Sequence, residues 1–262
     1  LGCLGGGVAG TEPDGTPREL EQEPALAVTL LRLPGAELHS FSLDTSSLPD
    51  LDGPAQPWLD QLGASPEPGQ SLVLLVDPTA AAINDLISGL DYAYPGVVKV
   101  GGIACPHSAS HGSLLFGDGV CAGAVGCLIG GAWRIEPVLA QGCRPIGPVL
   151  EIEQAQRNVV LEVSDGEHRR SPVAALQAIL VDLSPSEREQ VRHSLFLGVG
   201  RSDFSLASLR QEPSAFLVRN LIGVDPRNGA VAVAERMRVG QKVQFQLRDG
   251  AASRLEAEQL LG

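Results

Sequence analysis

The spacing of hydrophobic and polar positions predicts a strand, a helix and a second strand in the first half of the chain. Ser71–Val76 is a continuous apolar run, which is typical of a buried strand. The residues after Asp77 and Pro78 are apolar at three- and four-residue intervals, so they predict a helix that Asp77 caps. Residues 97–102 read as the second strand. Within about thirty residues these elements predict a β–α–β unit, a sheet with a helix packed on it.

The rest of the pattern predicts further strands and helices. Residues 25–33 are almost all apolar and are expected to form a buried strand. Lys242–Arg248 alternates between polar and apolar positions, which predicts an antiparallel or edge strand. Ser171 is expected to open a helix with one apolar face, and Ser184 and Glu187 have the spacing of a capping box for a second helix. Other strands are expected at 123–129, 159–163, 195–198 and 216–224, and a last helix after Asp249.

The segment from Val138 to Val149 has an unusually restricted backbone. Two glycines and two prolines set its geometry: Gly142, Gly147, Pro145 and Pro148. Gln141, Cys143 and Arg144 lie among them, so an amide, a thiol and a guanidinium are expected to face a pocket with little ordering cost on binding. A tight connector between two strands explains the same residues and stays open as the alternative.

Composition bounds the class of protein and its partners. The 262 residues, 44% of them hydrophobic, suffice for one large domain or two of ordinary size. With 31 acidic and 19 basic residues the formal charge is -12, which argues against nucleic acid or an anionic membrane as a partner. No apolar run approaches the roughly 18 to 20 residues that span a bilayer, and the five cysteines are irregularly spaced. We therefore expect a cytoplasmic protein with reduced thiols.

Motifs for common chemistries are weak in this sequence. Gly5, Gly7 and Gly10 match the dinucleotide-binding glycine pattern, but turn formers follow where that motif requires a helix. A loop with two cysteines and two histidines suggests zinc, yet its spacing fits no structural zinc site and a polar surface loop is preferred. These four residues are Cys105, His107, His111 and Cys121. We expect no cofactor, no metal and no catalytic residues.

Several segments together resemble a known family. They are VDP, LDYAYPGVVKVGGIA, DGVCAGAVGCLIGG, VLAQGCRPIGPV, FLVRNLIGVDPRNGAV and GQKVQFQLRDGAA. Their content and order resemble the FIST proteins, the F-box and intracellular signal transduction sensory domains, over nearly the whole chain. Further sequence normally precedes and follows these segments in that family, so the chain is expected to be truncated at both ends.

The resemblance carries expectations about fold and function. It implies an α/β (mixed α+β) fold with layered sheets flanked by helices, with a FIST N-type domain at residues 1–131 and a FIST C-type domain at residues 132–262. It also implies a cytoplasmic sensor of amino acids or related small metabolites. The sequence contains no kinase, cyclase or F-box segment, so any signalling output is expected to come from a separate partner protein. The family has no defined catalytic residues.

The residues expected to bind the ligand lie in three of the quoted segments. They are Gly101, Gly102, Gln141, Cys143, Arg144, Arg219 and Asn220. Among them the Arg144 guanidinium is expected to bind the carboxylate of an amino acid-like ligand. The alternative is that this guanidinium pairs with an acidic residue of the chain itself. Two other functions stay open: an enzyme with Cys143 as nucleophile and His107 or His111 as its partner, and a protein-interaction domain without a ligand.

Overall fold

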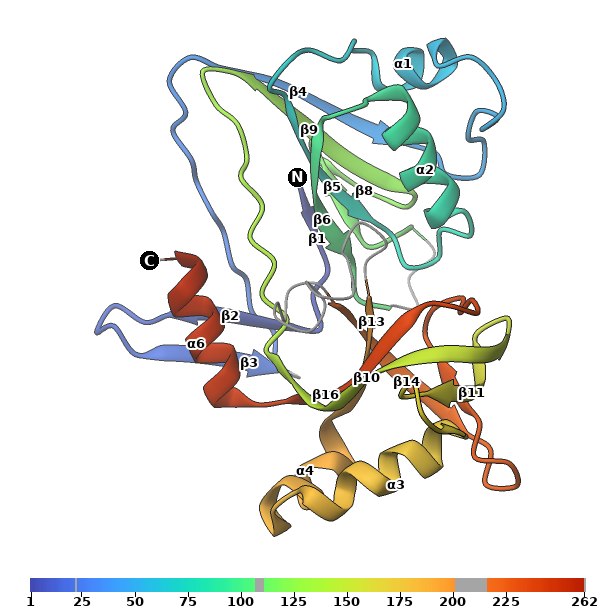
Figure 1. Ribbon diagram of the computed structural model, residues 1–262. Coiled ribbons are helices and arrows are strands. Elements are labelled where there is room, and N and C mark those ends of the chain that lie inside the picture. Colours follow the sequence, from blue (N-terminus) through green and yellow to red (C-terminus); the bar gives the residue numbers. More distant parts are fainter. Residues whose placement is uncertain (22, 107–110, 201–215, 262) are drawn as a thin grey trace. The chain divides into compact units, whose positions relative to one another are not determined.

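The computed structural model describes residues 1–21, 23–106, 111–200 and 216–261. These residues form two compact units, Leu1–Pro137 and Val138–Gly262 (Figure 1). Each unit has its own sheet and its own hydrophobic core, and both contain helices. The predicted mixed α/β class is therefore confirmed.

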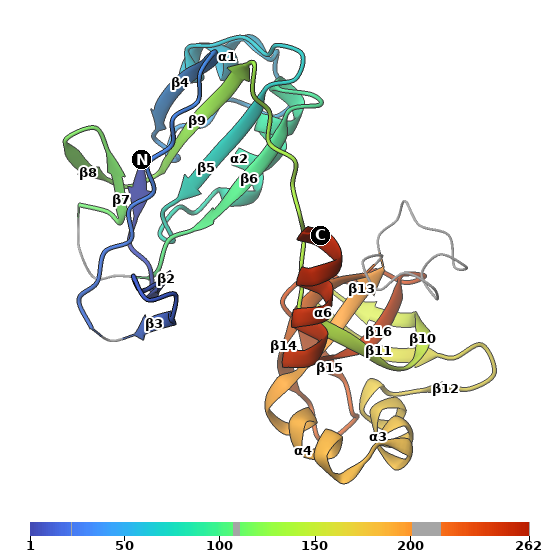
Figure 2. The same ribbon diagram turned by 90° about the vertical axis from the view of Figure 1, so that its left-hand side faces the viewer.

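The first unit is built on a four-stranded sheet in the order β4, β9, β5 and β6, which Figure 2 shows side by side. Only β5 and β6 run parallel, and α2 connects them, so the predicted β–α–β unit is confirmed. Helix α1 packs beside α2 on the same face. The bounds are β4 (Ala36–Leu43), α1 (Gln56–Leu62), β5 (Ser71–Val76), α2 (Ile83–Ala93), β6 (Val98–Ile103) and β9 (Ala124–Gly131).

Both faces of this sheet are covered, which explains why β5 is a continuous apolar run. Leu72 and Leu74 face the helices, where Trp58 is fully buried. Leu75 points to the opposite face and packs against Leu114 of a small second sheet. That sheet contains β1 (Gly2–Cys3), β7 (Leu114–Phe116) and β8 (Gly119–Cys121), and a separate hairpin contains β2 (Gly7–Thr11) and β3 (Pro17–Glu21).

Two predictions for this unit are wrong. Residues 25–33 form no strand, and Leu26 and Leu30 are 81% and 91% exposed, because none of the described strands pairs with this segment. Asp77 does not cap α2, which begins with Ala82 at its N-cap. Its buried carboxylate instead accepts hydrogen bonds from the Ser113 amide (2.8 Å) and from the Thr79 amide (2.9 Å). Asp77 therefore joins the end of β5 to the segment that enters β7.

The second unit is an antiparallel barrel of six strands. Their order is β10, β16, β13, β14, β15 and β11, and β10 pairs with β11 to close the ring. The bounds are β10 (Cys143–Gln156), β11 (Val159–Ser164), β13 (Leu195–Gly200), β14 (Phe216–Val224), β15 (Val231–Val233) and β16 (Lys242–Arg248), with β12 (Arg169–Arg170) attached to β11. The predicted antiparallel strand at 242–248 is confirmed, and closure places it between two neighbours.

Apolar side chains fill the barrel, and three described helices flank it. Ile152, Val233 and Leu247 are fully buried in this core. The helices are α3 (Pro172–Asp182), α4 (Pro185–Ser194) and α6 (Gly250–Leu261). The predicted caps are confirmed: Ser171 Oγ accepts from the Ala174 amide, and Ser184 and Glu187 form a capping box. Asp249 Oδ1 accepts from the first amides of α6.

Gly101 and Gly102 of β6 give a matched test of this fold. A Cβ at Gly101 would lie 1.7 Å from the Leu74 carbonyl oxygen of β5, whereas a Cβ at Gly102 would meet nothing within 4 Å. We expect Gly101→Ala to lower the free energy of unfolding by roughly 1 to 3 kcal/mol, the range for overpacked sites. Gly102→Ala should change it by less than about 0.5 kcal/mol. Urea unfolding of both variants measures this, and equal losses would contradict the β5–β6 register.

Candidate functional site

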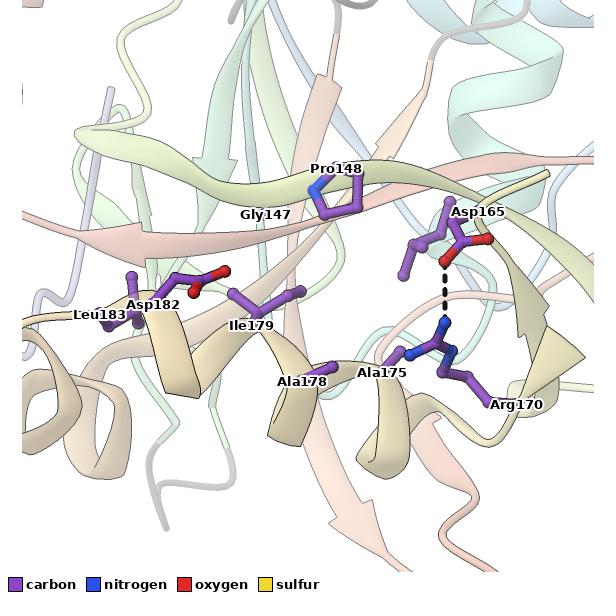
Figure 3. Close-up of a pocket in the computed structure, with 10 residues that line it drawn as sticks. Gly147, Pro148, Asp165, Arg170, Ala175, Ala178, Ile179, Asp182 and Leu183 are labelled. Carbon is purple, nitrogen blue, oxygen red and sulfur yellow. Dashed lines mark hydrogen bonds and ion pairs between the residues drawn. The ribbon is translucent and has the colours of Figure 1, made fainter. Parts of the chain in front are cut away.

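A cavity of about 220 Å³ lies between β10 and α3 of the second unit (Figure 3). Its apolar lining comes from Gly147, Pro148, Leu150, Ala175, Ala178, Ile179 and Leu183. Its charged lining comes from Asp165, Arg170 and Asp182. The cavity therefore combines an apolar body with a few charged groups, which is the usual composition of a small-molecule site.

An irregularity in β10 produces this cavity. The pairing of β10 with β16 shifts register between Ile146 and Leu150, as in a β-bulge. Gly147 lies inside the irregular stretch with φ 69, a backbone conformation that favours glycine. A Cβ there would lie 2.4 Å from Ile179 Cδ1 of α3. The bulge thus brings the β10 backbone close to Ile179, while the small side chains of Ala175 and Ala178 leave space beside it.

The charged groups lie at opposite ends of the cavity in Figure 3. At one end Arg170 Nη2 pairs with Asp165 Oδ2 at 2.9 Å. The pKa of the Asp165 carboxyl lies below its usual value because it accepts hydrogen bonds from the His168 and Glu167 amides and faces Arg170. At the other end is Asp182, the last residue of α3, whose carboxylate accepts no hydrogen bond from the described residues.

The structure places Gln141 where its predicted ligand contacts are already made within the chain. The Gln141 side-chain amide donates to the Phe216 carbonyl (2.6 Å) and accepts from the Val218 amide (2.7 Å). The backbone amides of Gln141 and Gly142 both donate to Glu256 Oε2 of α6, at 3.0 and 2.7 Å. This part of the segment fastens α6 and β14 to the start of β10.

Arg144 is paired with two carboxylates of its own unit. Its Nη2 lies 2.7 Å from Glu187 Oε1 of α4, and its Nε lies 3.2 Å from Asp249 Oδ2. The Ser184 hydroxyl, the Ser184 amide and Arg144 together lower the pKa of Glu187 to about 2. A ligand carboxylate at Arg144 would therefore compete with two internal acceptors.

The other predicted site residues are distributed over both units. Gly101 and Gly102 belong to the first unit, and the close approach of β5 explains the glycine at 101. In the second unit Arg219 pairs with Glu235 and also donates to the Val218 carbonyl. Asn220 is exposed on β14, and its side chain has no partner among the described residues. Gln141, Cys143 and Arg144 are the predicted residues that lie together at one corner.

Cys143 does not have the features of an activated nucleophile. Burial raises the pKa of its thiol, a hydrogen bond from Arg248 opposes that shift, and the charge of Glu256 adds to it. A raised pKa keeps the thiol protonated at neutral pH, whereas a nucleophile needs the thiolate. Of its two predicted partners, His111 belongs to the first unit and His107 lies outside the described residues.

The cavity residues Asp165, Arg170 and Asp182 were missed from the sequence. In sequence Asp165 reads as a turn residue, and Arg170 and Asp182 read as the flanks of a helix. A signal was present, since charged residues flank a helix that carries the small residues Ala174, Ala175 and Ala178.

Within the described ranges no three His, Cys, Asp or Glu side chains are grouped as metal ligands. None of the described helices is long and apolar enough to cross a membrane.

Together, these features define a mixed α+β protein whose barrel unit carries a cavity of about 220 Å³. The chain belongs to the FIST family: the FIST N domain matches residues 1–166 and the FIST C domain matches residues 173–262. FIST domains are sensory domains of signal transduction. The FIST N match extends past Pro137 through β10 and β11, so the two matched regions do not coincide with the two compact units.

Two mycobacterial relatives are similar to this chain. Uncharacterized protein Rv0628c of Mycobacterium tuberculosis is 34% identical over 258 residues, which cover 97% of this chain and 61% of the relative. Uncharacterized protein Mb0898c of Mycobacterium bovis is 35% identical over 183 residues, which cover 69% of this chain and 45% of the relative. The chain thus spans about three fifths of the length of the first relative. No solved structure matches it significantly.

The carboxylates around Arg144 predict an acid-sensitive unit. The folded-state pKa of Glu187, about 2, lies below the ordinary 4.5, and that of Asp249 is also lowered. Their contribution to stability is therefore complete above pH 4.5 and is lost as the pH falls toward 2. We expect Glu187→Gln to melt at a lower temperature than wild type at pH 7 and to lose less Tm between pH 5 and about 3. Melting curves that stay parallel over this range would contradict the pairing.

The raised pKa of Cys143 predicts slow alkylation. Cys3 is exposed and Cys143 is partly buried. With iodoacetamide at neutral pH we expect mass spectrometry to show Cys3 modified well before Cys143, and similar rates for both in urea, where burial is removed. Faster modification of Cys143 in the folded protein would show an activated thiol and would favour the enzyme hypothesis.

Proposed function

We propose that this chain is a small-ligand sensory domain and that its ligand binds in the cavity between β10 and α3. The family supplies the sensory class, and the cavity supplies a site of suitable chemistry. Its volume of about 220 Å³ lies below the roughly 300–1,000 Å³ of drug-sized pockets. This size suits an amino acid or a related small metabolite, the ligand class that the resemblance suggests.

The proposal rests mainly on two charged groups at the cavity that keep hydrogen-bonding capacity which no described residue uses, whereas the groups at the corner of Gln141–Arg144 are largely engaged. Asp182 is exposed and has no partner among the described residues, and Arg170 is bonded only through Nη2. At the corner, Glu256, Glu187 and Asp249 already occupy the amides and the guanidinium. A ligand at the corner would have to break these contacts, and that reorganisation would reduce its affinity.

Location and signalling output belong to the same proposal. A cytoplasmic sensor that passes its signal to a separate partner protein agrees with the acidic charge and with the family class. The exposed residues Leu26, Val28, Leu30 and Leu31 favour a contact with another protein as a second function. The enzyme hypothesis has less support, because burial keeps the Cys143 thiol protonated.

A metabolite screen by thermal shift tests the site. We expect a binding metabolite to raise the Tm of wild type and to have no effect on Ala178→Trp, in which the indole fills the cavity. Ala178 is exposed at the cavity edge, so the variant is expected to fold. Gln177→Trp is the matched control, because Gln177 is exposed on the same helix and does not line the cavity.

The alternative site at the corner makes the opposite prediction. If the ligand binds Arg144, then Arg144→Lys should weaken binding by roughly 1 to 3 kcal/mol, the scale of a charged hydrogen bond left unmade, and Ala178→Trp should not affect it. Calorimetric titration of both variants with the identified metabolite decides between the sites. Unchanged affinity in Ala178→Trp would overturn the proposed cavity.

A further inference from the structure

We infer that the cavity selects extended zwitterions, molecules with a carboxylate at one end, an ammonium group at the other and a methylene chain between them. 6-Aminohexanoate is a simple member of this class, and lysine has the same two end groups with an additional ammonium on its α-carbon. The inference rests on the proposed function, because it assigns a ligand chemistry to the same cavity. It goes further by excluding small amino acids whose only charges lie on one carbon.

The positions of the charged residues require a ligand whose two charges are well separated. Arg170 comes just before the N-cap of α3, and Asp182 is the last residue of this helix. The helix has 11 residues, so its ends are roughly 16 Å apart along the axis at 1.5 Å per residue. In Figure 3 the Asp182 carboxylate points along the helix toward Ile179, which shortens the span. A molecule with both charges on one carbon cannot reach both groups.

The polarity of the ligand follows from which groups are satisfied. Each Asp165 oxygen has partners: Oδ1 accepts from the Glu167 and His168 amides, and Oδ2 from Arg170. An incoming ammonium therefore displaces no protein donor at Asp182, whose exposed carboxylate at the cavity rim has no partner among the described residues. Arg170 uses only Nη2 within the described residues, so its other N–H groups remain to bind a carboxylate.

An arginine between two carboxylates already occurs in this unit. Arg144 pairs with Glu187 and Asp249 at the same time. Arg170 would have the same arrangement if Asp165 supplied one carboxylate and the ligand the other. In this arrangement Asp165 is a positioning residue, since it orients the guanidinium and does not touch the ligand.

The space between the charged ends is apolar, which matches a methylene chain. Pro148 and Leu150 line one side, and Ala178 and Ile179 line the other. A second cavity of about 330 Å³ shares Leu150 and Asp165 with the first. Its basic groups are already paired, Lys242 with Glu151 and Arg169 with Glu153. Neither of these basic residues lines the first cavity, so the ligand carboxylate is expected at Arg170, which does.

Calorimetric titration with defined probes tests the inference. We expect 6-aminohexanoate and lysine to bind wild type at least roughly tenfold more tightly than hexanoate, hexylamine or glycine, because each comparator loses one charged contact. Asp182→Asn should lower the affinity for 6-aminohexanoate by a similar factor and leave the affinity for hexanoate unchanged. Asp118→Asn is the control, since Asp118 is an exposed aspartate of the first unit with no partner among the described residues.

The outcomes separate this inference from the proposed function. Equal affinity of 6-aminohexanoate for wild type and Asp182→Asn, or binding that persists in Ala178→Trp, would overturn the inference. If neither probe binds but another metabolite binds and Ala178→Trp abolishes it, the cavity stands and its assigned ligand class is wrong. If no metabolite stabilises the wild-type chain, both fail.

Discussion

The two-sided pairing of β10 is the constraint on which the second unit depends. Its first residues pair with β16 and its last residues with β11, and these ladders together close the barrel. Closure satisfies strand edges that an open sheet would leave exposed. Because β10 breaks its register with β16 between Ile146 and Leu150, the strand bows over α3. The candidate site is therefore a consequence of the way the barrel closes.

Some polar groups around β10 are already bonded within the unit, and others are available to bind a ligand. Gln141, Gly142 and Arg144 hold α6, β14 and α4 to the strand, and all three have partners within the unit. Arg170 and Asp182 lie at the two ends of the cavity with bonding capacity left. A sensor needs both kinds, because a rigid frame lets a small ligand act on defined groups at low entropic cost.

Local features of the sequence predicted many elements correctly. Alternation located β16, a continuous apolar run located β5, and hydroxyl and carboxyl caps located α3 and α4. Contacts between residues far apart in the chain could not be predicted from such local features. Residues 25–33 have the composition of a strand but no described pairing partner, and the partners of Arg144 lie 43 and 105 residues away. For the same reason the Gln141–Arg144 segment looked like a binding site, and Arg170 and Asp182 were not singled out.

Methyl NMR of the isotopically labelled chain, titrated with a metabolite that raises its Tm, would show which residues the ligand contacts. If the ligand binds in the cavity, the largest shift changes are expected at the methyl groups of Leu150, Ile179 and Leu183, which line it. Methyl groups of the first unit should stay unchanged. The largest changes at residues around Gln141–Arg144 and α6, with Ile179 unaffected, would contradict the account and place the ligand at the corner.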